Sequence, residues 1–362
     1  MKRCSIIFAG GKTGGHLFPG IAVARKLKDY YGESLNIIFV GLRNGLEERA
    51  VPREGWKVEF IPMTTPRTGG VIGIFRFIFY SFPVSFLKSF LIIIKYRPSV
   101  IVGLGGYTAF PVALAGWLLF VPVVIMEQNT YMGITNRVLS IIASEVYLSF
   151  ESKEKDSWKY IYTGNPVRDF VLKRREDESR FVIGILGGSQ GAVGLNRLVM
   201  KMLPYLTDIK DRIHFIHQTG KHLHEEVKET YRRYGFSADT YEFIDDMGWF
   251  YGQVDLTISR AGATTIAELI RVGKPSIFVP FPHAADDHQR KNAEYIADAG
   301  GGIVFDENGD PEKLAKIVKE LFSDRKKLEE MSTSLKKLYR GDASGKIAER
   351  LKKFLERTCL EG

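Results

Sequence analysis

The sequence has 362 residues, of which 45% are hydrophobic and 26% are charged. This composition excludes a disordered chain, and at roughly 100–200 residues per domain the length predicts two or three domains. Two cysteines are too few for a disulfide framework or a cysteine zinc site. The first residues, MKRCSIIFAGGK, lack the long apolar stretch of a secretory signal, which predicts a cytoplasmic protein.

The positive charge is concentrated in the N-terminal half. Lys and Arg number 51 and Asp and Glu 42, a net charge of +9. Residues 1–165 contain 19 basic and 11 acidic residues (+8), whereas the remainder contains 32 and 31 (+1). A localised basic surface predicts an anionic partner, which could be nucleic acid, an acidic membrane surface or a phosphorylated substrate.

Short β-branched runs alternate with helical patterns along the whole chain, which indicates an α/β protein with parallel sheets. The runs predict strands at 5–8, 36–40, 58–61, 99–103, 122–126, 145–149, 181–186, 212–217, 240–244, 255–259 and 275–280. Residues 6–27 and 182–199 each read as strand, glycine-rich turn and amphipathic helix. We therefore expect two Rossmann-like units with a cleft between them, joined by a hinge near residues 162–168.

The first glycine-rich turn, AGGKTGGH at residues 9–16, precedes a predicted helix. A P-loop is excluded because the glycine that it requires would fall on Ile6, and the turn also lacks the dinucleotide pattern GxGxxG. Its backbone N–H groups and the helix dipole suit an anion, and His16 adds a titratable group at the helix start. A glycine turn that serves only packing remains an alternative.

Residues 71–94 are rich in aliphatic and aromatic side chains but contain Pro83 and two cations. Only 11 residues separate Arg76 from Lys88, fewer than the roughly 20 that a bilayer core requires. The pattern fits either an interfacial helix or a buried helix. The candidate membrane residues are Ile74, Phe75, Phe79, Phe82, Phe86, Arg76 and Lys88.

Polar or glycine-rich loops follow several predicted strands, where open α/β sheets bind ligands. They are GLGGY at 103–107, EQN at 127–129, GGSQG at 187–191, SRAGATTIAE at 259–268 and FPHAADDHQ at 281–289. Glu127 could instead cap the next helix, and Glu268 could be a solvated helix residue. The last loop contains His283, Asp286, Asp287 and His288 without an established ligand spacing, so we expect no metal site. Together the loops suit a diphosphate-bearing sugar donor.

Eight of these motifs occur in the order and spacing of one enzyme family: GGKTGGHLFPG, GLGGYTAFP, EQN, GNPVR, LGGSQGA, FIDDM, SRAGATTIAE and the DDHQ loop. The chain resembles, from Ile6 to about Phe305, the bacterial undecaprenyl-diphospho-muramoylpentapeptide N-acetylglucosaminyltransferases, which are GT-B glycosyltransferases. The resemblance implies an acceptor-binding, membrane-associating domain at 1–163, with a final helix at about 342–362 packed back on it. It also implies a UDP-sugar domain at 164–341.

The family's activity is the transfer of N-acetylglucosamine from UDP-GlcNAc to the C4 hydroxyl of the muramoyl sugar of lipid I (undecaprenyl-diphospho-muramoylpeptide), with inversion, which gives lipid II. The resemblance therefore implies UDP-GlcNAc and lipid I as substrates and an anionic membrane surface as partner. It implies a peripheral protein at the cytoplasmic face of the inner membrane, with neither a cofactor, a metal nor nucleic acid required.

Residue roles follow from the matched motifs. His16 is the candidate base, and Tyr107 and Glu127 are expected to face the acceptor. The expected donor-binding residues are Thr13, Gly14, Gly15, Asn129, Arg168, Ser189, Ile244, Ala263, Thr264, Thr265, Glu268 and Gln289. The chain departs from the family at Lys12, where a third glycine is usual.

Two other functions remain open at this point. The same fold and donor could serve another acceptor, as in a glycolipid synthase. Alternatively, the basic N-terminal half could bind nucleic acid, although its cations adjoin aliphatic sequence rather than an aromatic stacking platform.

Overall fold

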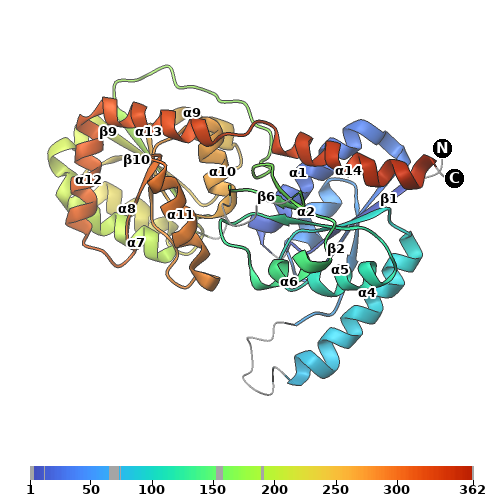
Figure 1. The fold of residues 1–362 in the computed structure, drawn as a ribbon. Coiled ribbons are helices and arrows are strands. Elements are labelled where there is room, and N and C mark those ends of the chain that lie inside the picture. The colour runs from blue at the N-terminus through green and yellow to red at the C-terminus, as the bar shows by residue number, and fades with distance from the viewer. Residues whose placement is uncertain are drawn as a thin grey trace. The chain divides into compact units, whose positions relative to one another are not determined.

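The structure is a computed structural model that describes residues 4–11, 13–64, 73, 75–151, 158–188 and 191–360 (Figure 1). The chain forms two compact units, Met1–Arg168 together with Arg340–Gly362, and Asp169–Tyr339. These boundaries lie a few residues from those expected at 163/164 and 341/342. Each unit contains one parallel sheet, so the predicted α/β class with two parallel sheets is confirmed.

The sheet of the first unit has seven strands in the order β3-β2-β1-β4-β5-β6-β7. Successive strands pair in parallel, with Ile6 of β1 opposite both Ile37 of β2 and Val100 of β4. The strands are β1 (Cys4–Ala9), β2 (Leu35–Gly41), β3 (Lys57–Phe60), β4 (Val100–Gly103), β5 (Val123–Glu127), β6 (Glu145–Leu148) and β7 (Tyr160–Tyr162). Five of them are almost wholly buried, which explains their continuous apolar sequence.

Helices cover both faces of this sheet. One core cluster joins it to α1 (Gly14–Tyr31), α2 (Glu47–Arg53) and α14 (Ala343–Leu360). The other joins it to α4 (Phe82–Tyr96), α5 (Ala109–Leu118) and α6 (Ile134–Ile142). Short turns of helix occur at η1 (Gly32–Ser34) and η2 (Phe77–Ser81), and η2 leads directly into α4 (Figure 1).

The sheet of the second unit has six parallel strands in the order β10-β9-β8-β11-β12-β13. They are β8 (Phe181–Leu186), β9 (Ile213–Gln218), β10 (Ser237–Tyr241), β11 (Leu256–Ser259), β12 (Ser276–Phe278) and β13 (Gly302–Val304). The helices are α7 (Val193–Met202), η3 (Leu203–Arg212), α8 (His224–Tyr234), α9 (Met247–Gln253), α10 (Ala263–Val272), η4 (Ala285–Asp287), α11 (His288–Asp298), α12 (Pro311–Ser323) and α13 (Arg325–Leu338). Its main core lies between the sheet and α7, α8, α12 and α13.

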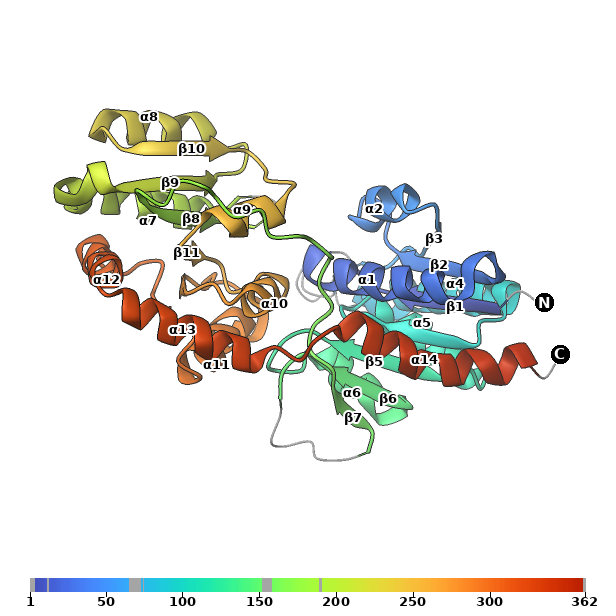
Figure 2. The same ribbon diagram turned by 90° about the horizontal axis from the view of Figure 1, so that it is seen from above.

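Helix α14 returns to the first unit and lies beside α1 (Figure 2). Apolar side chains of α14 complete one core cluster of that unit. Its cations also meet Glu145 of β6, which is 3% exposed. The carboxylate accepts hydrogen bonds from Tyr147, from Lys353 and from Arg350, with Nη2 of Arg350 at 2.6 Å. Burial raises the pKa of Glu145, but the hydrogen bonds from Arg350 and Lys353 outweigh it and the net pKa is lowered.

Because the folded-state pKa of Glu145 lies below the unfolded value, its stabilising effect is present above the unfolded pKa and is lost as pH falls through the folded one. We expect Glu145→Gln to lower the free energy of unfolding by about 1–3 kcal/mol at pH 7. The difference from the wild type should shrink as pH falls below the ordinary glutamate pKa of about 4.3, because the stabilising effect of the wild-type carboxylate is then progressively lost. Chemical denaturation across this pH range measures it.

Glu151→Gln is the matched control because Glu151, which is 64% exposed at its side chain, also meets the returning chain, at Arg340. An exposed ion pair contributes less than about 1 kcal/mol. Equal losses for the two variants, or a Glu145→Gln deficit that does not change with pH, would contradict this role of Glu145.

Candidate functional site

The strand order of the first sheet reverses between β1 and β4, so the loops that follow these strands diverge from one point. Open α/β sheets bind ligands at such a switch point, outside the carboxyl ends of the strands. The two loops touch, since a Cβ on Gly10 would lie 2.4 Å from the carbonyl oxygen of Gly105. Gly10 also has a φ of 104°, so only glycine fits there without strain.

His16 lies in the first turn of α1, directly above the second of these loops. Its Nδ1 is 3.0 Å from Oγ1 of Thr13, the N-cap residue of the helix. Its ring covers Gly105, where a Cβ would lie 2.8 Å from the imidazole Cδ2. Gly14 and Gly15 are the first two residues of the same helix. The structure therefore brings together Thr13, Gly14, Gly15 and His16 at the switch point.

Glu127 ends β5 and is 3% exposed. Its Oε1 accepts hydrogen bonds from the backbone and side-chain nitrogens of Asn129, at 3.0 and 3.3 Å. Its Oε2 accepts from Gly133, the N-cap residue of α6, at 3.2 Å and from Nδ2 of Asn136 at 2.9 Å. Burial raises the pKa of Glu127, and these hydrogen bonds oppose the increase. The carboxylate thus holds together the loop after β5, as the helix-capping alternative anticipates, rather than projecting toward solvent.

Tyr107 lies in the loop after β4, where it packs partly buried against the core. Arg168 is exposed at the end of the segment that leaves the first unit. Ser189, Lys12 and Ile74 lie outside the described residues, so their expected roles are not addressed by the structure.

The second sheet has its switch point between β8 and β11, where Gly187 and Gly188 follow one strand and residues 260–262 follow the other. Helix α10 begins here without a side-chain cap, since its N-cap residue is Gly262. The first hydrogen bond of the helix runs from Ile266 to Gly262, so the N–H groups of Ala263, Thr264 and Thr265 precede the ladder. These donors and the helix dipole make this end suited to a phosphate. Thr264 Oγ1 is buried here without a hydrogen-bond partner among the described residues.

Gln218, at the end of β9, connects two loops of this site. Its Nε2 donates to the carbonyl of Gly188 at 2.8 Å, and its Oε1 accepts from the backbone N–H of Ile244 at 3.0 Å. The side chain is 4% exposed, so the bridge is shielded from water. The amide of Ile244 is therefore engaged, and a nucleobase at this position would meet its carbonyl.

Glu268 lies one turn and a half into α10 and is 4% exposed. Its Oε2 accepts a hydrogen bond from the hydroxyl of Tyr251, on α9, at 3.0 Å. The solvated-helix alternative for Glu268 is therefore wrong. The hydrogen bond fixes the orientation of this buried carboxylate, and each of its oxygens can accept more than one hydrogen bond.

Gln289, in the first turn of α11, accepts a hydrogen bond from the backbone N–H of Phe281 at 3.0 Å. It thereby fixes the loop that follows β12. Arg260 reaches the same loop, donating to the carbonyls of Val279 and Pro280 and pairing with Glu307. Among the residues that the structure describes, no group of three or more His, Cys, Asp or Glu could hold a metal ion.

Three residues that sequence reasoning missed connect the candidate residues: Asn136, Gln218 and Tyr251. Asn136 is a polar residue on the buried side of an amphipathic helix, and Gln218 ends a buried strand, so a polar exception to an apolar pattern could have found both. Tyr251 left no such signal because it lies in an aromatic-rich helix, MGWFYGQ.

In the first unit, η2 and α4 present an apolar outer surface. We call it the apolar helix face and define it by its exposed side chains Phe75, Ile78, Phe79, Tyr80, Val84, Leu87, Leu91 and Ile94. The opposite side of the helix is buried through Ser81, Ser85, Ser89, Ile92 and Ile93. Phe82 and Phe86 are only partly buried and stack on each other. Phe77–Tyr96 is the one helix in the described parts of the chain that is long and apolar enough to cross a membrane.

Two units, each built on one parallel sheet with glycine-rich loops and a helix N-terminus at its switch point, are the architecture of GT-B glycosyltransferases. The crystal structure of Acinetobacter baumannii MurG superposes with a TM-score of 0.80, at 27% identity over 97% of this chain and 99% of that one. Residues 6–148 match the glycosyltransferase family 28 N-terminal domain, and residues 182–347 match the family 28 C-terminal domain.

Relatives cover almost the full length. A Myxococcus xanthus protein named UDP-N-acetylglucosamine--N-acetylmuramyl-(pentapeptide) pyrophosphoryl-undecaprenol N-acetylglucosamine transferase is 41% identical, over 95% of this chain and 91% of its own. A protein of the same name from Geobacter metallireducens is 36% identical, over 96% and 97%. This chain belongs to glycosyltransferase family 28.

Proposed function

We propose that this chain transfers N-acetylglucosamine from UDP-GlcNAc to the C4 hydroxyl of the muramoyl sugar of lipid I, which gives lipid II in peptidoglycan synthesis. The observation that supports it most is the near full-length identity to relatives named for this reaction. The acceptor is assigned to the first unit, and most of the donor-binding residues are assigned to the second.

Inversion requires a base that removes the proton of the C4 hydroxyl as its oxygen attacks the anomeric carbon and UDP departs. His16 is suited to this role if its Nδ1 is protonated and donates to Thr13 Oγ1, because Nε2 then has its lone pair available. Glu127 is assigned a positioning role. Its carboxylate holds Asn136, and Nδ2 of Asn136 would lie 3.5 Å from a Cβ on Gly105, the residue that the His16 ring covers.

The departing diphosphate gains negative charge, which the N-terminus of α10 stabilises through the N–H groups of Ala263, Thr264 and Thr265. The ribose hydroxyls are assigned to Glu268 and the uracil to the backbone of Ile244. Ser189 and Arg168 are assigned to the nucleotide, and Asn129 and Gln289 to the sugar. We propose that no metal ion is needed here, and UDP release in the presence of EDTA tests this point.

Release of UDP from UDP-GlcNAc, measured with and without a soluble lipid I analogue, tests donor, acceptor and reaction together. We expect acceptor-dependent release and a product heavier by one N-acetylglucosamine residue. A panel with diacylglycerol and other glycolipid acceptors separates this function from a glycolipid synthase, since preferential use of those acceptors would exclude lipid I as the substrate.

The hydrogen bond from Tyr251 predicts a specific effect on donor binding. Tyr251→Phe should raise the donor KM roughly 3- to 10-fold with little change in kcat. The variant loses the hydrogen bond that orients Glu268, and such a bond contributes about 1 kcal/mol. In a double-mutant cycle with Glu268→Gln the effects should not be additive. Tyr234→Phe, on α8, is the control, and additive effects would mean that Tyr251 does not act through Glu268.

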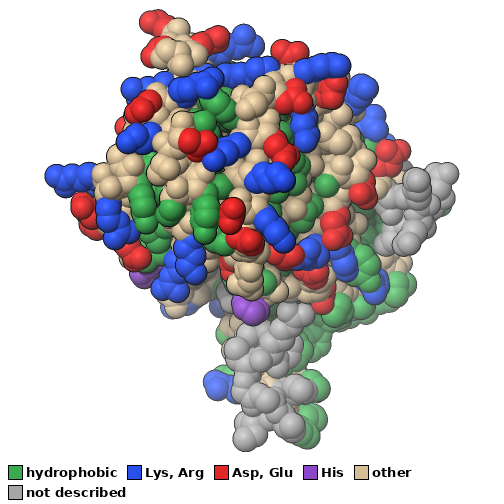
Figure 3. All heavy atoms as spheres, turned by 90° about the vertical axis from the view of Figure 1, so that its left-hand side faces the viewer, with side chains coloured by type: hydrophobic (Ala, Val, Ile, Leu, Met, Phe, Trp, Pro, Cys, Tyr) green, Lys and Arg blue, Asp and Glu red, His purple; other side chains and the backbone are tan. Residues whose placement is uncertain are grey.

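We further propose that the apolar helix face docks on the anionic cytoplasmic surface of the inner membrane as a peripheral contact. Arg76 and Lys88 lie within it and can meet lipid phosphates. The opposite side of the helix is packed against the unit, which favours docking over insertion. The +8 charge of the N-terminal half also favours binding to an anionic membrane surface. By contrast, the face of the second unit shown in Figure 3 mixes basic and acidic side chains.

Replacing Phe79 and Leu87 by Asp should weaken binding to phosphatidylglycerol–phosphatidylcholine vesicles. The two side chains are 71% and 60% exposed, and burying one large apolar side chain contributes about 1.5–3 kcal/mol, so each change should cost roughly 10-fold or more. Val171→Asp, an exposed apolar residue of the second unit, is the control in vesicle sedimentation. Unchanged sedimentation of the double variant, or retention of the protein on DNA at physiological salt, would overturn the proposal.

A further inference from the structure

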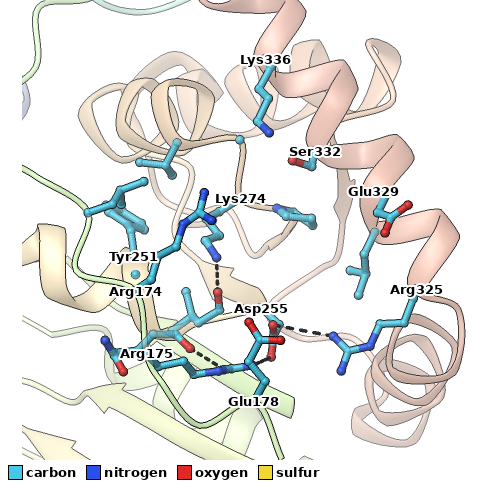
Figure 4. A pocket seen from close by; sticks show the side chains of 18 residues that line it. Arg174, Arg175, Glu178, Tyr251, Asp255, Lys274, Arg325, Glu329, Ser332 and Lys336 are labelled. Carbon is cyan, nitrogen blue, oxygen red and sulfur yellow. Dashed lines mark hydrogen bonds and ion pairs between the residues drawn. The ribbon is translucent and has the colours of Figure 1, made fainter. Parts of the chain in front are cut away.

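A cavity lies in the second unit, at the opposite edge of its sheet from the candidate donor site. It has a volume of about 340 Å³ (Figure 4). Asp255 directly precedes β11, and Lys274 and Pro275 precede β12, so these lining residues mark the amino-terminal edge. The remaining walls come from residues 172–178, the end of α9 and helix α13. None of the motifs assigned to the donor or the acceptor lies here.

Cations outnumber carboxylates in the lining, with five Lys or Arg against three Asp or Glu. Only one carboxylate is paired with them. Asp255 accepts a hydrogen bond from Arg175 at 2.8 Å and another from the backbone N–H of Val182, and it lies 3.7 Å from Arg325. Arg175 and Arg325 are therefore compensated by Asp255.

The other three cations, Arg174, Lys274 and Lys336, have no ion pair among the described residues. Lys274 is partly buried and donates to the carbonyl of Val254. Burial lowers its pKa; Asp255 raises it, and Arg175, Arg174 and Lys336 lower it further. These cations thus act on one another across the cavity, and an anion between them would relieve the repulsion.

The geometry favours a ligand with several oxygens. The aliphatic chain of Lys336 lies over Gly273, where a Cβ would be 2.6 Å from its Cε. Figure 4 shows Lys336 and Ser332 directed from α13 toward the space that holds Lys274, with Arg174 beside it. Phosphate oxygens accept hydrogen bonds from a guanidinium, from ammonium groups and from a hydroxyl, and the cavity offers all three kinds of donor.

We propose that this cavity binds a small anion with one or two phosphate groups, held by Arg174, Lys274, Lys336 and Ser332. The proposal goes beyond the proposed function and does not rest on it. Tyr251 forms part of the cavity wall, and its hydroxyl donates to Glu268. A bound anion thus lies one residue from the carboxylate assigned to the ribose, which gives it a route to alter donor affinity.

Isothermal titration of the full-length protein with inorganic diphosphate tests the proposal, with UDP present at saturation so that the donor site is occupied. Inorganic phosphate and glycerol phosphate, a soluble lipid headgroup, are titrated in parallel. We expect saturable binding that weakens roughly 10- to 100-fold in Arg174→Ala and in Lys336→Ala, since each removes a charged hydrogen-bond donor. Lys337→Ala, on the same helix but outside the lining, should bind as the wild type does.

Arg174 and Lys336 are exposed, so their variants should keep the wild-type melting temperature, which verifies that they are folded. Tighter binding of diphosphate identifies a free phosphate compound as the ligand class, and tighter binding of glycerol phosphate through the same side chains identifies a lipid headgroup. Absence of saturable binding at millimolar concentrations of all three anions overturns the proposal. So does binding that neither variant weakens.

Discussion

Replacement of His16 by alanine should lower kcat for acceptor-dependent UDP release by roughly 10²–10⁴-fold, the usual contribution of a general base. The donor KM should change little, because the residues assigned to the uracil, the ribose and the diphosphate, from Ile244 to Glu268, belong to the other unit. His222→Ala, at an exposed position of that unit, is the control. Turnover close to that of the wild type in His16→Ala would assign the base to another residue.

The partner of His16 refines this prediction. Nε2 can take a proton only in the tautomer whose Nδ1 carries the hydrogen. In that tautomer Nδ1 donates to the hydroxyl of Thr13, which holds the ring in the active form. Thr13→Val should lower kcat about tenfold, whereas Thr13→Ser, which keeps the hydroxyl, should retain most activity. If both variants behave alike, the hydrogen bond does not set the tautomer.

Replacement of Gly105 by alanine should lower kcat by roughly 10²-fold, the usual cost of displacing a reacting group by about 1 Å. A Cβ at this position would lie 2.8 Å from His16 Cδ2 and 3.2 Å from Nε2, so the imidazole must move. The measurement is UDP release at saturating donor and acceptor.

Gly106→Ala is the matched control. Both glycines have a positive φ, 97° and 75°, so alanine is strained at either by about 1 kcal/mol. At Gly106, however, a Cβ would meet nothing within 4 Å. A similar loss of kcat in both variants would attribute the effect to backbone strain, and not to the position of His16.

The sequence predicted the central strands of both sheets because they are buried on both faces and read as continuous apolar runs. The edge strands were harder. β7 and β13 were not predicted, and the strand expected at 240–244 lies at Ser237–Tyr241 instead. These strands are half exposed. β10, with the sequence SADTY, therefore lacks the apolar run that marks a buried strand, and the exposed Phe243 drew the predicted strand beyond its true end.

At the candidate site, sequence order indicated which loops end strands and hence which residues share a sheet edge. Sequence order could not indicate the directions of their side chains or the residues that these side chains contact. Glu127 folds back on its own loop, and Glu268 meets Tyr251 from another helix. Such contacts depend on how helices pack on the sheet, which no local pattern specifies.

The return of α14 has a consequence for how this chain is built. The second unit is one continuous segment, Asp169–Tyr339, whereas the first is made from two segments. The two crossing points are neighbours, since a Cβ on Gly164 would lie 3.5 Å from the Cβ of Arg340 and 3.6 Å from that of Ala343. The second unit is thus an insertion within the first. A short loop that joins residue 168 to residue 340 should therefore give the first unit as an autonomously folding protein, whereas truncation before residue 340 should expose the core of that unit.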